Sequence, residues 1–88
     1  MAQETEVISV TYDPEADAAY ISFSSASSAR QVQLDDSRVL DYAQDGSLVG
    51  VEILSPSLGV DLSGLPRAGE VSDAIRGLGF AVMTGGGR

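Results

Sequence analysis

"RVLDYAQDGSLVGVEIL", residues 38–54, contains two runs of alternating polar and apolar residues that are joined at Asp45 and Gly46. Asp-Gly between two such runs is a strong short-range signal of a β-hairpin and favours a two-residue type I′ turn. The pairs that this turn imposes are Gln44 with Ser47, Tyr42 with Val49, Leu40 with Val51 and Arg38 with Ile53. The sequence therefore predicts an antiparallel hairpin whose register is set by its turn.

The predicted register sorts the side chains of this hairpin onto two faces. The first face carries the apolar residues Leu40, Tyr42, Val49, Val51 and Ile53. The second face carries Asp41, Gly50 and Glu52 together with Val39 and Leu48. Turn chemistry and face pattern select the same register independently, which supports the prediction.

Outward from the hairpin, alternating apolar residues predict strands over residues 7–12, 18–23 and 30–35. Residues 55–69 are rich in Gly and Pro and predict an irregular connector. A helix is predicted over residues 70–80, with a short final strand after it. The apolar face of the helix consists of Val71, Ala74, Ile75 and Leu78, and Gly79 is placed as its C-terminal cap.

These elements predict the α+β class: a small antiparallel β-meander of four to five strands, followed by one C-terminal amphipathic helix packed on the sheet. We expect a single domain over residues 7–84, a disordered N-terminus over residues 1–6 and a flexible tail over residues 85–88. The helix offers few apolar positions, and both sheet faces carry some hydrophobic residues. A homodimer is therefore expected.

Composition excludes several kinds of chemistry. The 88 residues include no Cys and no His, so disulfides, thiolate nucleophiles, the Ser-His triad and most zinc sites are excluded. What remains for catalysis is carboxylates, Ser, Thr, Tyr and Arg. No catalytic residue and no cofactor are predicted.

The charge is strongly acidic, with 13 Asp and Glu residues against five Arg, and a net charge of −8. The arginines are scattered, so neither nucleic acid nor a membrane is expected as a partner. Two interpretations of the acidity stay open: solubility in a cytoplasm, or complementarity to a basic protein partner. No signal peptide and no apolar run of about 20 residues is recognised, so a cytoplasmic location is expected.

Asp13, Glu15 and Asp17 have the alternating spacing that opens a calcium loop. Such a loop also needs a Gly near its sixth position and a carboxylate at its twelfth, where this chain has Ala18 and Ser24. A proline directly after Asp13 favours a turn instead, and Asp17 is expected to accept bonds from backbone amides there. The three acids are therefore interpreted as turn residues and not as a metal site.

Asp41 and Glu52 form the second candidate group, because the predicted register places them diagonally across Gly50 on one face. Two close carboxylates could act as an acid/base pair or bind Mg²⁺, and Gly50 could leave room for a ligand or another backbone. The alternatives are a solvated face, ion pairs with Arg30 or Arg38, or contact with a partner. Asp41, Gly50 and Glu52 are thus the candidate interaction face.

The segment "YDPEADAAYI" followed by "VLDYAQDGSLVGVEIL" resembles the bacterial domain-of-unknown-function family 2283, also called YuzE-like. The resemblance covers roughly residues 7–54 and implies a compact β-meander with a helix. It implies no established activity. An antitoxin-like or partner-binding role follows only by analogy.

The sequence leaves two functional hypotheses. The first is a non-enzymatic protein–protein interaction module, of which an antitoxin-like protein that neutralises a basic partner is one form. The alternative is a carboxylate-dependent divalent-metal-binding protein or hydrolase that uses the same acids. The second hypothesis requires a concave pocket that gathers at least two acids and also binds Mg²⁺ or Mn²⁺. The first predicts a flat surface, no metal dependence and a stoichiometric partner.

Overall fold

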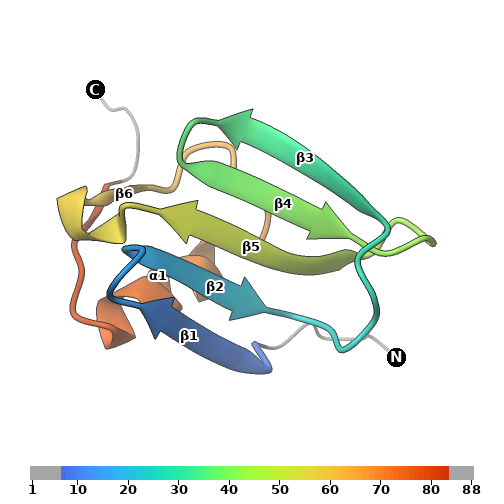
Figure 1. Cartoon of the computed structure of the whole chain (residues 1–88), viewed down its shortest axis with the longest axis horizontal. Coiled ribbons are helices and arrows are strands. Elements are labelled where there is room, and N and C mark those ends of the chain that lie inside the picture. Colours follow the sequence, from blue (N-terminus) through green and yellow to red (C-terminus); the bar gives the residue numbers. More distant parts are fainter. Residues whose placement is uncertain (1–6, 84–88) are drawn as a thin grey trace.

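The fold consists of an antiparallel sheet with one helix on a single face, shown in Figure 1 as a computed structural model that describes residues 7–83. The expectations for residues 1–6 and 84–88 lie outside this range. The main sheet consists of β1 (Ser9–Asp13), β2 (Ala18–Ser22), β3 (Arg30–Asp35), β4 (Arg38–Tyr42) and β5 (Leu48–Leu54). A 3-10 turn (Pro56–Leu58), β6 (Val60–Asp61), α1 (Ala68–Gly77) and β7 (Val82–Met83) complete the chain.

The predicted α+β class is confirmed, but the strand order is more complex than a simple meander. The order is β1-β2-β5-β4-β3, so β2 pairs with β5, and β3 lies at the far edge. The segment after β2 passes around one end of the sheet to reach β3 (Figure 1). The central position of β5 has a physical reason. This strand is rich in buried residues, and the centre of the sheet gives it a hydrogen-bonded neighbour on each side. The two short strands β6 and β7 pair in parallel as a separate ribbon.

The tip of the β4–β5 hairpin differs from the predicted type I′ turn. The Gly46 amide donates to the carbonyl oxygen of Ala43 (2.9 Å), and the Ala43 amide donates to the carbonyl oxygen of Ser47 (2.8 Å). Gly46 has a φ of 89°, but the φ of Asp45 is not positive, whereas a type I′ turn needs positive φ at both positions. The carboxylate of Asp45 instead accepts bonds from the amide (3.0 Å) and hydroxyl (2.7 Å) of Ser47. These bonds stabilise a three-residue loop that ends on a left-handed glycine.

The longer loop moves the pairing near the tip by one residue. Tyr42 pairs with Leu48, not with Val49 as predicted. Because paired residues share a face, Leu48 packs against the core, which corrects its predicted position beside Asp41. The register shifts again between Asp41 and Tyr42, and this bulge restores the predicted pairing beyond it. The confirmed pairs are Leu40 with Val51 and Arg38 with Ile53.

The core lies between the sheet and α1. Val71 and Ile75 are both 0% exposed, and Ala74 and Leu78 pack against the same core, so the predicted helix face is confirmed. Gly79 follows the C-cap residue Leu78 and has a φ of 91°, as its predicted role at the end of the helix requires. Among the described residues, no helix is long and apolar enough to cross a membrane. Figure 1 shows α1 behind the sheet, on one face only.

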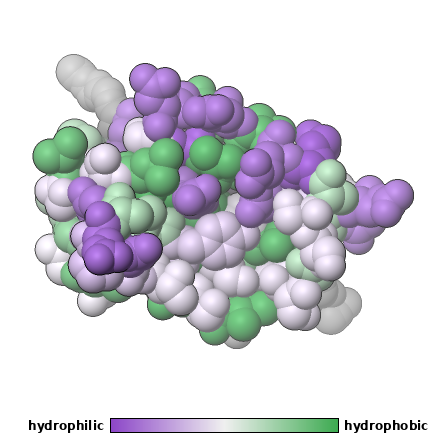
Figure 2. Space-filling model, viewed as in Figure 1, coloured by the Kyte–Doolittle hydropathy of each residue, from purple (hydrophilic) through white to green (hydrophobic). Residues whose placement is uncertain are grey.

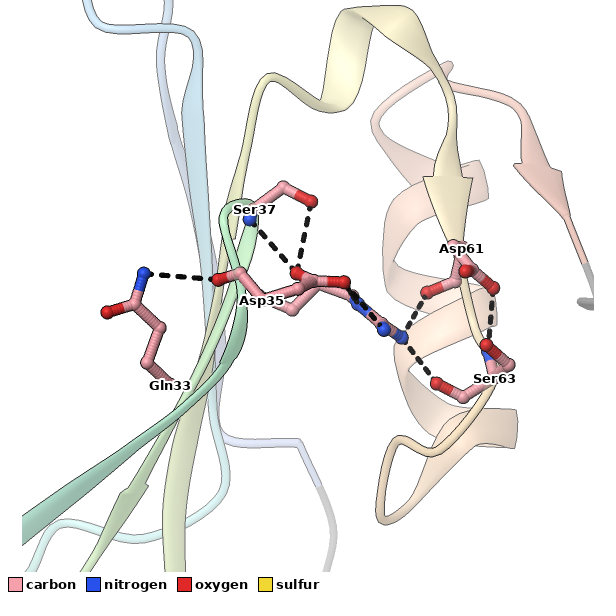
Figure 3. Close-up of polar contacts among 6 residues, drawn as sticks. Gln33, Asp35, Ser37, Asp61 and Ser63 are labelled. Carbon is pink, nitrogen blue, oxygen red and sulfur yellow. Dashed lines mark hydrogen bonds and ion pairs between the residues drawn. The ribbon is translucent and has the colours of Figure 1, made fainter.

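Arg38 joins the sheet to the segment that follows β5. Its Nε and Nη2 donate to Oδ2 of Asp35 (3.1 and 2.8 Å), and its Nη1 donates to the backbone carbonyls of Asp61 (3.0 Å) and Ser63 (Figure 3). The hydrogen bond from Arg38 is the main reason why the pKa of Asp35 falls to about 2. The proposed ion pair of Arg38 with Asp41 or Glu52 is therefore wrong within this chain. The guanidinium of Arg38 makes its hydrogen bonds on the core side of the sheet, not with the acids of the opposite face.

Candidate functional site

The face of the sheet opposite α1 carries two rows of cross-strand neighbours, which we call the outer face. The first row is Thr11, Tyr20, Glu52, Val39 and Gln33, and the second row is Ser9, Ser22, Gly50, Asp41 and Gln31. Figure 2 shows the molecule from this side, with hydrophilic and intermediate residues between separate hydrophobic patches. The outer face is thus a mainly polar surface and not the continuation of a core.

Charge is distributed unequally between the two faces. The charged residues of the two rows are the carboxylates Asp41 and Glu52, and none of the four arginines within residues 7–83 belongs to these rows. Arg30 instead places its guanidinium 4.9 Å from the centre of the Tyr42 ring, so its suggested pairing with the two acids is not observed. The outer face is acidic as a result.

Tyr20 occupies the space that the sequence left open at Gly50. Its hydroxyl donates to Oδ2 of Asp41 at 2.9 Å. A Cβ atom built on Gly50 would lie 2.1 Å from the Tyr20 hydroxyl oxygen and 2.3 Å from its Cζ. The prediction of room for a ligand or another backbone at Gly50 is therefore wrong, because the glycine accommodates the phenol of Tyr20.

Asp41 is far more buried than a solvated face residue. It is 8% exposed, and its Oδ1 is buried without a hydrogen-bond partner among the described residues. The register places it opposite Gly50, and places Glu52, which is half-buried, opposite Val39. The predicted diagonal arrangement of the two acids is present. The solvated interpretation is wrong for Asp41.

The environment of Tyr20 disfavours its ionised form. Burial, the hydrogen bond to Asp41 and the negative charges of Asp41 and Glu52 together raise the pKa of Tyr20 from 10.0 to about 12. Sequence analysis missed this residue as part of the site. Tyr20 alternates with the buried Ala19 and Ile21 and so faces away from the core, but only the pairing of β2 with β5 brings it to Asp41.

This raised pKa predicts a measurable alkaline transition. A group whose pKa is higher in the folded state stabilises the fold below its unfolded pKa, and this contribution disappears as pH rises from about 10 towards about 12. Titration of phenolate absorbance should show a late step near pH 12 that is missing in Tyr20→Phe. The hydrogen bond to Asp17 also raises the pKa of Tyr12, so the comparison is made in a Tyr12→Phe background. A step near pH 12 that persists there after Tyr20→Phe would contradict this assignment.

The turn acids hold the β1–β2 hairpin and its contact with the 3-10 turn. Oδ1 of Asp13 accepts bonds from the amides of Glu15 (3.0 Å) and Ala16 (3.4 Å), which confirms the predicted turn. Asp17 differs from the prediction, because it accepts bonds from the hydroxyls of Tyr12 (2.8 Å) and Ser57 (2.5 Å) and from the distant Ser57 amide (3.4 Å).

Asp17 thus ties the hairpin to the 3-10 turn that follows β5. These bonds lower its pKa, chiefly through Ser57. Within residues 7–83, no group of three or more acidic side chains is arranged to hold a metal ion.

Fold and site together define a small α+β protein with a helix on one face of its sheet. The other face is acidic and carries the hydrogen-bonded pair of Tyr20 and Asp41 beside Glu52. Residues 9–57 match the model of the family described as "Protein of unknown function (DUF2283)". The match covers more than half of the chain and all five strands of the main sheet, so the chain belongs to this family, as its resemblance indicated. No curated protein and no solved structure matches the chain significantly.

Proposed function

We propose that this protein is a non-enzymatic interaction module that binds a basic surface of a partner protein through its outer face. The observation that carries the proposal is a sheet face without a covering layer, on which the charged side chains of the two rows are carboxylates. Complementary charge favours encounter with a basic partner and selects against acidic ones. Neutralisation of a basic, toxin-like protein in the cytoplasm is one form that this function takes.

A homodimer is part of the same proposal. The support for it is the sheet face that α1 leaves uncovered, which a second copy would cover. Ile8 (59% exposed) and Leu58 (82% exposed) are further apolar side chains in contact with solvent. Self-association through Ile8 and Leu58 instead would leave the outer face free for a partner, because neither residue belongs to its two rows. Light scattering of the purified protein measures the mass directly, and a monomer at all concentrations would remove the dimer from the proposal.

The binding proposal is tested by capture from the native host with matched variants. A tagged chain should recover a basic protein in stoichiometric amount at low salt, and recovery should fall as salt rises. Glu52→Lys reverses a charge on the outer face, whereas Asp73→Lys reverses an exposed charge on α1. We expect Glu52→Lys to weaken binding by about tenfold or more and Asp73→Lys to leave it nearly unchanged. Equal recovery by both variants, or no stoichiometric partner, would reject the proposal.

A further inference from the structure

A groove of about 350 Å³ opens on the outer face beside the β1–β2 hairpin. We call it the hairpin groove. Tyr20 is its aromatic side chain, Ala16 and Ala18 are its small residues, and Asp13 and Glu52 are its carboxylates. Tyr12 borders it with its backbone side, because its ring packs against Phe80 on the core side of the sheet. Two acids in one groove meet the geometric condition of the metal-binding alternative, but no third acid of the described residues joins them. Its volume is near the lower end of the range of about 300–1,000 Å³ for ligand pockets. This size suits one inserted side chain.

The lining of the hairpin groove has the chemistry that recognises a cationic side chain. A flat aromatic ring attracts a cation placed over its face, and a nearby carboxylate adds charge attraction and hydrogen bonds. Small alanine side chains leave space for the apolar stem of such a ligand. Arginine fits better than lysine, because its planar guanidinium stacks on a ring and presents a fork of donors to a carboxylate.

Two hydrogen bonds order the Tyr20 and Asp13 side chains of the groove before any ligand arrives. Tyr20 is tied through its hydroxyl to the buried Asp41 (2.9 Å), and Asp13 is tied through Oδ1 to the amide of Glu15 (3.0 Å). Groups that are already ordered lose little entropy on binding, so the groove is preorganised. Asp41 acts here as a positioning residue for the ring of Tyr20.

The geometry points to the hairpin groove as the anchoring site for one arginine side chain of the partner protein, with the guanidinium between the Tyr20 ring and Glu52. This inference rests on the proposed function, since it names the part of a basic partner that the outer face receives. Glu52 supplies the carboxylate, and Tyr20 supplies the ring.

The experiment uses three capped tripeptides, Gly-Arg-Gly, Gly-Lys-Gly and Gly-citrulline-Gly, titrated into isotope-labelled protein at low salt and followed by amide chemical shifts. For Gly-Arg-Gly we expect saturable shifts around Ala18, Tyr20 and Glu52, with a dissociation constant on the order of 1 mM. The lysine peptide should bind several-fold more weakly. The citrulline peptide, which has nearly the same shape without charge, should not bind. Equal shifts for arginine and citrulline, or shifts centred on α1, would overturn the inference.

Matched variants distinguish binding in the hairpin groove from general attraction of the peptide to a negatively charged protein. Glu52→Gln and Asp73→Asn each remove one negative charge, and only the first should weaken Gly-Arg-Gly binding, by about fivefold or more. Asp41→Asn keeps an acceptor for the Tyr20 hydroxyl and should retain binding, whereas Asp41→Ala should lose it together with the late phenolate step. Equal effects of Glu52→Gln and Asp73→Asn would reject the groove.

Failure of this inference is distinguishable from failure of the proposed function. If the peptide does not bind but Glu52→Lys still abolishes capture of a partner, the outer face binds proteins without an arginine in the groove. If the peptide binds in the groove and no partner is captured, the groove recognises guanidinium and the proposed function is wrong.

Discussion

Replacement of Arg38 by methionine is expected to lower the free energy of unfolding by about 3 kcal/mol. Methionine retains an unbranched apolar stem but removes every donor, so the carbonyls of Asp61 and Ser63 lose the bonds that Nη1 gives them. Asp35 also loses its charged partner. For a chain of this length the whole stability is on the order of 4–13 kcal/mol, so one residue carries a large share of it.

Urea unfolding followed by circular dichroism measures this loss. Arg76→Met is the matched control, because Arg76 is exposed in the last turn of α1 and its removal should cost less than about 1 kcal/mol. Arg38→Lys should recover only part of the loss, since one ammonium cannot reach a carboxylate and two carbonyls with the geometry of a guanidinium. Similar losses for Arg38→Met and Arg76→Met would show that the bonds of Arg38 contribute little.

The hairpin shows which local features the sequence determines. Alternation correctly places Leu40, Val51 and Ile53 on the core face, and the predicted pairs of Leu40 with Val51 and Arg38 with Ile53 are present. Leu48 is the exception, because the bulge turns it towards the core. The loop did not follow, because Asp-Gly serves both two-residue and three-residue hairpins. The bonds from Ser47 to Asp45 favour the longer loop, and periodicity contains no information about them.

The candidate site depends on contacts between distant parts of the chain, and these could not be predicted. Asp41 and Glu52 were found because both lie in one hairpin. Tyr20 reaches Asp41 only because β5 inserts between β2 and β4, and Asp17 meets Ser57 only once the 3-10 turn folds back on the first hairpin. Both contacts require the strand order, for which short-range patterns provide no signal.

The family match covers the sheet but not the helix. It spans residues 9–57, which include Tyr20, Asp41, Gly50 and Glu52 but not α1. The sheet and its outer face therefore belong to the shared part of the chain. The helix that covers the other face lies beyond the match.

Replacement of Gly50 by alanine is expected to lower the free energy of unfolding by about 2 kcal/mol, because the added methyl group cannot coexist with the observed position of Tyr20. The new Cβ would lie 2.1 Å from the phenol oxygen and 2.7 Å from Cε2. The ring must move, and Asp41 then loses the only hydrogen bond that its side chain is seen to accept within the described residues. Gly77→Ala is the matched control, since nothing lies within 4 Å of a Cβ there. In a helix that change should stabilise by up to about 1 kcal/mol.

A double-mutant cycle identifies the cause of the loss at Gly50. In a Tyr20→Ala background, Gly50→Ala should cost almost nothing, because the ring that the methyl group displaces is already absent. In the wild-type background the same change should also lower the pKa of Tyr20 from about 12, since the displaced phenol leaves Asp41 and gains contact with water. An equal cost in both backgrounds would place the strain in the backbone of β5 instead. Gly50 would then be needed for the backbone conformation of β5, and the hydrogen bond between Tyr20 and Asp41 would not depend on it.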